Sequence, residues 1–548
     1  MRRGWTGWMA VLLSAVLLWP AGAVQGKESL SPPSPKRMGE FRTQPGKPGT
    51  WSLGETPPNM DPSKPPIVFV HGLHGTSDSW RGDTKYHGPN DMYEIVYSRG
   101  YRTAFVELNA ESQADDMWTN GRLLASMLKQ IHQHFGERVN IVAHSKGGVD
   151  SQAALVHSSA WPYVGRVITL GSPHRGSHLA DLAYSWWAGW LAELLGRRDA
   201  GTECLQTGYM EYFRSVTDSN ANVSKNSYFT AAGTNWGPFP SSLWLGGAYL
   251  SPRGSNDGLV NVWSTYLPYG RHLFTADVDH DALRKGSTSF PRIESVLGTT
   301  AKAASTDEKT MAETAAVSGE NGSPGGEQLV RGGPIGSGAE IVEEVPVESG
   351  QEEILFHVMA GDAGVGISLR SPSGKVYTEQ SPHFIKGQDT EIFKGAAVQA
   401  YRIDRPEAGT WKVRLKSKNN SAYLLAVSFT GATKVQTKVK APTALGQEVP
   451  VRLDMKGTDL DPKKFHVRMR LSPPGSKRVS AMKAKGFQGQ MQLAPKDGRG
   501  SFTGKLPPLK TPGVYNLTLD IEGKNDRGER FQRTEIRSFY VPAPDKKN

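Results

Sequence analysis

The chain has 548 residues, enough for roughly three to four domains of ordinary size. Its composition, 37% hydrophobic and 21% charged, excludes a polytopic membrane protein, a collagen-like fibre and a fully disordered chain. The net charge is +11, yet residues 430–548 alone carry 24 basic and 11 acidic side chains. The positive charge is therefore a property of the C-terminal end.

Residues 1–26 have the features of a secretory signal peptide. Arg2 and Arg3 give a positive start, Met9–Trp19 is apolar, and Ala21–Ala23 offers small residues for cleavage. A membrane anchor is the alternative, but the apolar stretch of 11 residues is shorter than the ~20 that span a bilayer. We expect an exported protein, either free or held at the cell surface.

Composition divides the rest of the chain into five parts. Residues 27–65 are rich in proline and predict an extended lead-in. Residues 66–298 alternate strands and helices, whereas residues 299–340 contain no aromatic side chain and predict a flexible linker. We expect β-sandwiches over residues 341–430 and 431–548, because short β-forming runs there are separated by turns.

The alternation in residues 66–298 indicates the fold class. Apolar side chains recur at helical spacing from residue 118 to residue 135. Such an order predicts an α/β fold, with a mostly parallel sheet and helices on both faces. The predicted buried strands are Ile67–Val70, Thr103–Leu108, Arg138–Ala143 and Arg166–Leu170.

A serine stands where the third of these strands meets the next helix. The sequence there is Ala143-His144-Ser145-Lys146-Gly147. A small residue, a serine and a glycine in this context are typical of a nucleophile elbow, where the turn is too tight for larger neighbours. An incidental serine in a tight turn is the alternative.

The elbow and four further segments resemble the α/β-hydrolase superfamily, and within it the secreted bacterial lipases. The resemblance covers residues 66–298 and implies an α/β-hydrolase fold. Val70–Gly75 is similar to the oxyanion loop of those lipases, and Leu170–Ser177 is similar to their Gly-Thr-Pro-His-x-Gly-Ser segment. Asn256–Val260 is similar to the loop that carries the catalytic acid, and Asp279–Asp281 to the loop that carries the histidine.

The resemblance implies a catalytic triad of Ser145, Asp257 and His280. A serine hydroxyl needs a base to take its proton, and the base needs a carboxylate to hold it. The three residues follow the superfamily order of serine, acid and histidine. His272 and Asp277 are the competing base and acid, but His272 lies in a strand-like run and Asp277 is too near His280 in sequence.

By the same resemblance, the backbone N–H groups of Leu73 and Lys146 form the oxyanion hole. Such donors stabilise the negative charge that develops on the ester oxygen. The side chains of these two residues are not expected to take part.

No metal or other cofactor is predicted. His71 and His74 lack a third ligand at useful spacing. A structural calcium ion is an alternative to simple hydration of the acidic loop near the predicted histidine. Its candidate ligands are His174, Asp277, Asp279 and Asp281.

A Trp-rich segment follows the Leu170–Ser177 motif. Trp186, Trp187 and Trp190 lie among leucines with few charges, which predicts a helix with little polar face. We expect either a buried core helix or a lid at the rim of the active site, because tryptophan is favoured where lipid meets water.

The basic C-terminal module has charges close together. Alternation in Phe465–Arg470 would place His466, Arg468 and Arg470 on one face of a strand. An anionic cell-envelope surface is the expected partner, and a solvated surface without a partner is the alternative. Nucleic acid is not expected, because stacking aromatic side chains are missing among the basic residues.

Together these features predict a secreted serine ester hydrolase, foremost a triacylglycerol lipase, that acts on a lipid or ester substrate through an acyl-enzyme. A carboxylesterase or a polyester depolymerase would use the same triad. A surface-binding protein with an incidental hydrolase domain is the alternative from another class, and the complete set of motifs argues against it.

Overall fold

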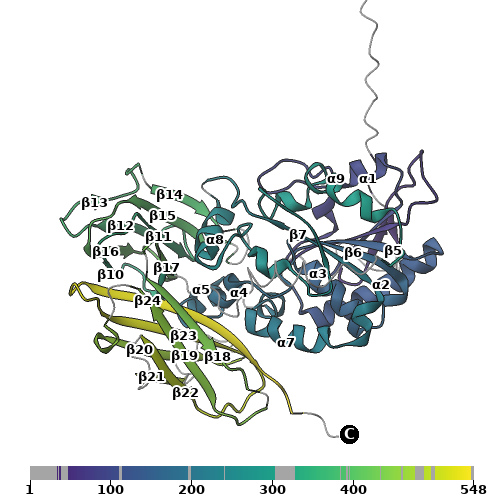
Figure 1. Ribbon diagram of the computed structural model, residues 1–548. Coiled ribbons are helices and arrows are strands. Elements are labelled where there is room, and N and C mark those ends of the chain that lie inside the picture. Colours follow the sequence, from purple (N-terminus) through teal and green to yellow (C-terminus); the bar gives the residue numbers. More distant parts are fainter. Residues whose placement is uncertain are drawn as a thin grey trace, which may run out of the picture.

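The computed structural model shows an α/β domain with two β modules packed against it (Figure 1). The predicted signal peptide lies outside the described residues. Within the described part of the chain, no helix combines the length and the apolar character needed to cross a bilayer. The structure describes residues 32, 34, 36–38, 47–109, 114–195, 199–239, 241–302, 327–382, 384–389, 393, 395–431, 433–442, 444–457, 461–474, 487–494 and 500–544.

An eight-stranded sheet forms the centre of the α/β domain, in the order β1-β2-β4-β3-β5-β6-β7-β8. Strands β3 to β8 pair in parallel, whereas β1 and β2 add an antiparallel edge. Strands β3 to β7 are almost wholly buried, as expected for a sheet covered on both faces. The strands are β1 (Lys36–Met38), β2 (Trp51–Leu53), β3 (Ile67–Val70), β4 (Thr103–Val106), β5 (Val139–His144), β6 (Val164–Leu170), β7 (Ser227–Gly233) and β8 (Arg271–Ala276).

Helices cover both faces of this sheet, which confirms the predicted fold class. Leu124 and Leu128 of α2 pack on one face, while Tyr93 of α1 and Phe290 of α9 pack on the other. The helices are α1 (Met92–Ser98), α2 (Met117–Phe135), α3 (Lys146–Gln152), α4 (His178–Ala183), α5 (Gly189–Leu194), α6 (Ala200–Glu203), α7 (Thr207–Asp218), α8 (Ser242–Leu250) and α9 (Gly286–Leu297).

Two predicted boundaries differ from the structure. The lead-in over residues 27–65 contributes β1 and β2, and Trp51 of β2 is buried and donates to Gln130 at 3.0 Å. The linker predicted over residues 299–340 extends too far, because β9 (Gln328–Ile335) lies inside it. Residues 303–326 of that range are outside the described part. Both segments form strands because they pair with distant strands, and their own composition does not show this.

The first β module is a sandwich of two antiparallel sheets, β14-β15-β11-β17-β9 and β10-β16-β12-β13. Phe356, Tyr401 and Trp411 lie in the core between them. Its strands are β9, β10 (Glu340–Val347), β11 (Glu353–Ala360), β12 (Gly366–Arg370), β13 (Val376–Tyr377), β14 (Phe384–Gln388), β15 (Ala397–Asp404), β16 (Gly409–Lys416) and β17 (Ser421–Phe429).

The second β module is one seven-stranded antiparallel sheet, in the order β18-β19-β22-β21-β20-β23-β24. The sheet curves around its own core, which contains Leu453, Phe502 and Leu519, and the module is therefore barrel-like. Its strands are β18 (Lys434–Val439), β19 (Val449–Lys456), β20 (Phe465–Ser472), β21 (Phe487–Leu493), β22 (Ser501–Leu506), β23 (Gly513–Lys524) and β24 (Arg530–Val541).

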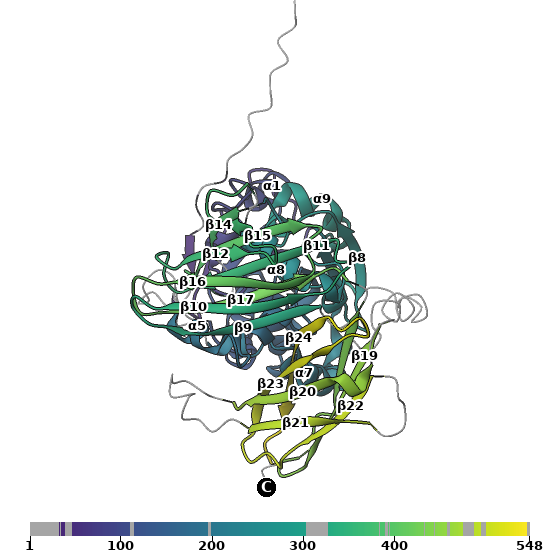
Figure 2. The same ribbon diagram turned by 90° about the vertical axis from the view of Figure 1, so that its left-hand side faces the viewer.

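Both β modules pack against the α/β domain, and Figure 2 shows the first module in front of that domain with the second below it. Helices α4, α5 and α8 share one apolar core with β11, β15 and β17 of the first module. The second module reaches the same domain through β24, where the Ser538 hydroxyl donates to the buried Asp181 carboxylate at 2.6 Å. Asn516 of β23 donates to the Asp181 carbonyl oxygen at 2.7 Å.

Gly208 of α7 should control the docking of the second module. A Cβ atom at Gly208 would lie 2.4 Å from backbone atoms of Phe539 in β24. Gly208→Ala should therefore destabilise the docked module by about 1–3 kcal/mol, the usual cost of overpacking. Gly298→Ala is the matched control, because a Cβ atom there meets nothing within 4 Å. Calorimetry should show a lower melting temperature for Gly208→Ala alone, and equal melting temperatures would contradict the expected role of this contact.

Candidate functional site

Ser145 stands between β5 and α3 with a backbone φ of +53°. This conformation is strained for a serine, and close packing maintains it. A Cβ atom on Gly72 would lie 2.7 Å from the Ser145 Cβ, and one on Gly147 would lie 2.4 Å from the His71 carbonyl oxygen. Glycine is required at both positions, and the turn has the geometry of a nucleophile elbow.

Asp257 and His280 form a buried hydrogen-bonded pair. His280 follows β8, and its Nδ1 lies 2.8 Å from Asp257 Oδ2. The other carboxylate oxygen accepts from the backbone N–H groups of Leu259 at 3.1 Å and Val260 at 2.8 Å. These bonds fix the carboxylate and place the ring proton on Nδ1, which leaves Nε2 as the basic nitrogen.

This pair lies beside the elbow at the carboxyl edge of the sheet. The rings of His144 and His280 are 4.6 Å apart, and His144 Nε2 donates to the His280 carbonyl oxygen at 2.8 Å. Burial and the neighbouring His280 hold the pKa of His144 well below its ordinary value, so this ring is neutral. A Cβ atom on Gly171, after β6, would lie 3.0 Å from Asp257 Oδ2. The structure thus brings the three predicted triad residues to one place.

The two predicted oxyanion donors flank the serine. Lys146 is the first residue of α3, and Leu73 follows the glycine that touches Ser145. The Lys146 side chain is 1% exposed, and its Nζ donates to Asp150 Oδ1 at 2.6 Å. This side chain is therefore a buried structural partner of Asp150, since a lysine in the first turn of a helix reaches a carboxylate four residues later.

The competing base and acid have other partners. His272 hydrogen-bonds with the hydroxyls of Thr230 and Thr275. Asp277 is exposed and accepts from Asn235 at 3.1 Å. None of these hydrogen bonds joins His272 or Asp277 to the buried Asp257–His280 pair.

The candidate metal ligands also have protein partners. Asp279 lies 2.7 Å from His87 Nε2, and Asp281 pairs with Arg284 at 2.6 Å. Across the described residues, no group of three or more His, Cys, Asp or Glu side chains is arranged to hold a metal ion. The remaining candidates have these partners: Thr169 for His174, Gly72 for His71 and Asp199 for His74.

The Trp-rich segment is not the single helix that its sequence predicts. Helix α4 ends before Trp186 and Trp187, and α5 resumes before Trp190. All three tryptophans are partly buried, and Trp187 and Trp190 pack against the apolar core shared with the first β module. The apolar side chains of this segment are therefore covered by packing between the α/β domain and the first β module.

Trp187 makes the most specific of these contacts. Its Nε1 donates to Asp520 of the second module at 3.1 Å. The guanidinium groups of Arg331 and Arg470 lie 5.2 and 4.9 Å from the ring centroid, at cation–π distance. The tryptophan therefore joins the α/β domain to both β modules.

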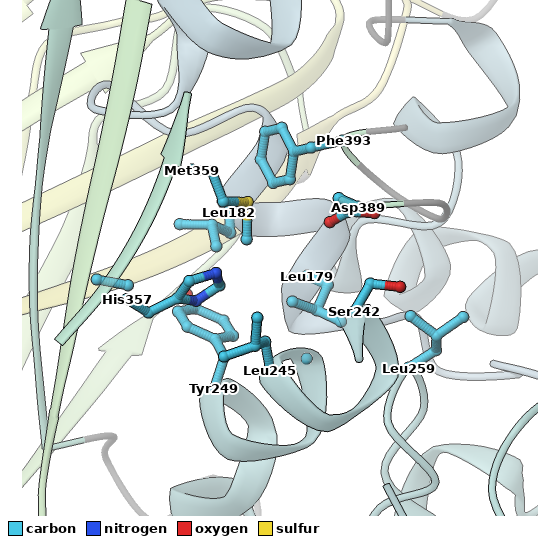
Figure 3. A pocket seen from close by; sticks show the side chains of 12 residues that line it. Leu179, Leu182, Ser242, Leu245, Tyr249, Leu259, His357, Met359, Asp389 and Phe393 are labelled. Atoms are coloured by element: carbon cyan, nitrogen blue, oxygen red, sulfur yellow. The ribbon is translucent and has the colours of Figure 1, made fainter. Parts of the chain in front are cut away.

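An apolar surface beside the buried pair faces the first β module. Leu259 lies two residues after Asp257 and lines a small cavity between the two domains (Figure 3). Across the cavity, His357 of β11 has a buried Nε2 with no hydrogen-bond partner, and burial lowers its pKa to about 4. Other residues that line the cavity are Leu179, Leu245, Tyr249, Met359 and Phe393.

Three buried polar residues near the elbow were not predicted from the sequence. Asp150, Asn120 and Asn109 are at most 3% exposed. Asn120 interrupts the apolar face of α2, and Asp150 lies four residues after Lys146 in a buried helix. The sequence signal that could have identified them is a polar residue at a position where the pattern predicts the core.

The α/β domain is similar to known lipases. A family profile described as PGAP1-like alpha/beta domain matches residues 61–184. Triacylglycerol lipase 2 of Saccharomyces cerevisiae is 25% identical over 272 residues, which cover 41% of this chain and 82% of the yeast protein. A triacylglycerol lipase of Pseudarthrobacter phenanthrenivorans is 32% identical over 123 residues, 21% of this chain and 35% of that protein.

A solved structure extends the similarity beyond this domain. The crystal structure of Bacillus licheniformis lipase BlEst2 in propeptide form matches with a TM-score of 0.70 and 34% identity. The match covers 92% of this chain and 99% of the Bacillus chain, so it includes parts of both β modules. The chain therefore belongs to the family of α/β-hydrolase lipases that contains this Bacillus enzyme, and it is a carboxylic ester hydrolase.

Proposed function

We propose that this hydrolase is a triacylglycerol lipase that forms an acyl-enzyme on Ser145. One observation carries the proposal: the buried hydrogen bond between His280 and Asp257 lies beside a serine held at positive φ. A serine in that position has both a base and a carboxylate that orients the base.

In the proposed reaction, His280 Nε2 takes the Ser145 proton as Oγ attacks the ester carbonyl carbon. Asp257 stabilises the imidazolium, and the N–H groups of Leu73 and Lys146 stabilise the negative oxygen of the tetrahedral intermediate. His280 then gives its proton to the leaving alcohol. Water attacks the acyl-enzyme with His280 as base, which releases the fatty acid and restores the serine.

The surroundings of the site support a lipid substrate. Leu73, Trp236 and Trp244 pack against the same apolar core as Leu259, close to the buried pair. Two relatives are named triacylglycerol lipases. A carboxylesterase or a polyester depolymerase with the same triad is the second candidate. Membership of the lipase family sets aside the non-catalytic alternative.

Replacing the proposed triad residues should abolish activity. Ser145→Ala, Asp257→Ala and His280→Ala should each lower kcat/KM for p-nitrophenyl butyrate by about 10³-fold or more, without additivity, because the three act as one unit. Asp277→Asn is the control and should keep its rate, since that carboxylate is exposed. Near-native activity of Asp257→Ala would show that another residue is the acid.

We further propose that the two β modules act as a removable propeptide that covers the lipid-facing surface of the enzyme. Support comes from the apolar core that α4, α5 and α8 share with the first module. The Bacillus relative of similar architecture was solved in what is called its propeptide form. Short soluble esters need little of this surface, whereas the long chains of a triglyceride need much of it.

A buried charge on the sandwich side should uncover the surface. Met359 is 5% exposed and lines the cavity, so Met359→Lys would bury an ammonium in a largely apolar interface. A shift of about 1.4 kcal/mol changes the docking equilibrium tenfold. The rate on emulsified triolein, relative to p-nitrophenyl butyrate, should therefore rise about tenfold or more.

Val342→Lys is the matched control, because Val342 is 46% exposed on the other sheet of the same module. An equal ratio in both variants would contradict the covering role. A rise on short esters alone would favour an esterase over a lipase.

We also propose export, from the signal-peptide features of residues 1–26, and adsorption to anionic cell-envelope polymers through the net charge of the second module. The expected alternation in β20 is confirmed by its burial pattern. However, Arg468 pairs with Glu522, and Arg470 pairs with Asp520. These two arginines are used within the protein, so adsorption is supported by the net charge alone.

A further inference from the structure

Four buried polar side chains form a hydrogen-bonded chain beside Ser145. Lys146 Nζ donates to Asp150 Oδ1 at 2.6 Å, and Asn120 Nδ2 donates to Asp150 Oδ2 at 3.0 Å. The same Nδ2 lies 3.5 Å from Asn109 Oδ1. Burying polar groups is costly unless they are paired, so such a chain in the centre of a domain calls for an explanation.

The far end of this chain holds the oxyanion loop. Asn109 Nδ2 donates to the Gly72 carbonyl oxygen at 3.1 Å. His71 Nδ1 donates to the same oxygen at 3.0 Å, because His71 Nε2 accepts the Leu108 N–H at 3.0 Å and the ring proton must be on Nδ1. Burial lowers the pKa of His71 to about 4, so the neutral ring keeps this tautomer. The Gly75 N–H adds a third donor at 3.1 Å.

The Gly72 carbonyl and the Leu73 N–H belong to one peptide group. In a planar trans peptide these two groups point in opposite directions. The donors that hold the Gly72 oxygen therefore also set the direction of the Leu73 N–H. Gly72 itself lies against Ser145, so this peptide is held close to the serine.

The near end of the chain holds the other donor. The Lys146 N–H follows Ser145 directly, and its side chain is anchored to Asp150 one helical turn later. Asn120 ties Asp150 to α2. Both backbone donors are thus connected to one set of buried side chains.

We propose that Asn109 is a positioning residue for the oxyanion hole, acting through the Gly72–Leu73 peptide, and that Asn120 and the Asp150–Lys146 pair align the second donor with it. This inference rests on the proposed serine mechanism. It assigns a role to buried side chains that take no direct part in that reaction.

Asn109→Ala should slow the chemical step without weakening substrate binding. The oxyanion exists only in the transition state and intermediate, so kcat for p-nitrophenyl butyrate should fall about 10- to 100-fold while KM stays unchanged. Affinity for an alkyl boronic acid, which forms a tetrahedral anion on the serine, should fall by the same factor. Asn109→Asp keeps the size of the side chain, but its carboxylate cannot donate a hydrogen bond when ionised. This variant should therefore show the same changes in kcat and boronic acid affinity as Asn109→Ala.

Asn226→Ala is the matched control. Asn226 is also buried, and its Nδ2 donates to the carbonyl oxygens of Trp161 at 3.2 Å and Val164 at 2.6 Å, at the opposite edge of the sheet. This variant should lower the melting temperature and leave kcat and boronic acid affinity unchanged. The same pattern in both Asn109 variants would show a purely structural role and overturn the inference.

Ser145→Ala distinguishes this failure from failure of the mechanism. An inactive Ser145→Ala with an unchanged kcat in the Asn109 variants removes only the positioning role. An active Ser145→Ala removes the serine mechanism, and the positioning role with it.

Discussion

The apolar core between the α/β domain and the first β module is the contact on which the arrangement of this enzyme depends. Leu179 and Leu245 contribute to it from one side, and Met359 and Phe393 from the other. Each large apolar side chain buried in this way contributes about 1.5–3 kcal/mol relative to exposure. A surface that would be costly in water is therefore stable while it is covered, and it would suit lipid once uncovered.

Buried polar groups add orientation to this apolar contact. The Asp520 carboxylate accepts a hydrogen bond from the Trp187 indole of the α/β domain and forms an ion pair with Arg331 of the first module. Between the modules, Arg533 binds both carboxylate oxygens of Glu348, at 3.1 and 2.9 Å. Such pairs add little net stability because their desolvation is costly, but an incorrect alignment would leave a charge unpaired. We infer that they fix how the three units sit together.

The sequence predicted those parts of the fold whose pattern is local. Strands β3 to β6 and helix α2 each carry their own apolar spacing, and the elbow at Ser145 carries its own motif. Asp257 and His280 could be named from motif order, and the parallel sheet explains why they meet, since the carboxyl ends of its strands lie at one edge.

Other parts depended on partners far away in sequence. Strand β2 forms by pairing with β4, and β9 forms by pairing with β17. Neither strand has a strong alternation of apolar residues in its own sequence. The Trp-rich segment has the composition of one buried helix, but Trp187 packs against arginines that follow it by more than a hundred residues. Asn109, likewise, gains its role only because the fold brings its side chain to Gly72.

Covalent labelling can test whether Ser145 attacks esters at a site whose lipid-facing side is covered. A p-nitrophenyl alkylphosphonate leaves an adduct on an activated serine, which mass spectrometry can locate. In the intact chain, the ethyl reagent should label Ser145 about tenfold or more faster than the hexadecyl reagent. After proteolysis between residues 302 and 327 and separation of the β modules, the two rates should become similar. An adduct on another residue would contradict the role of Ser145, and fast labelling of the intact chain by the hexadecyl reagent would contradict the covering of the site.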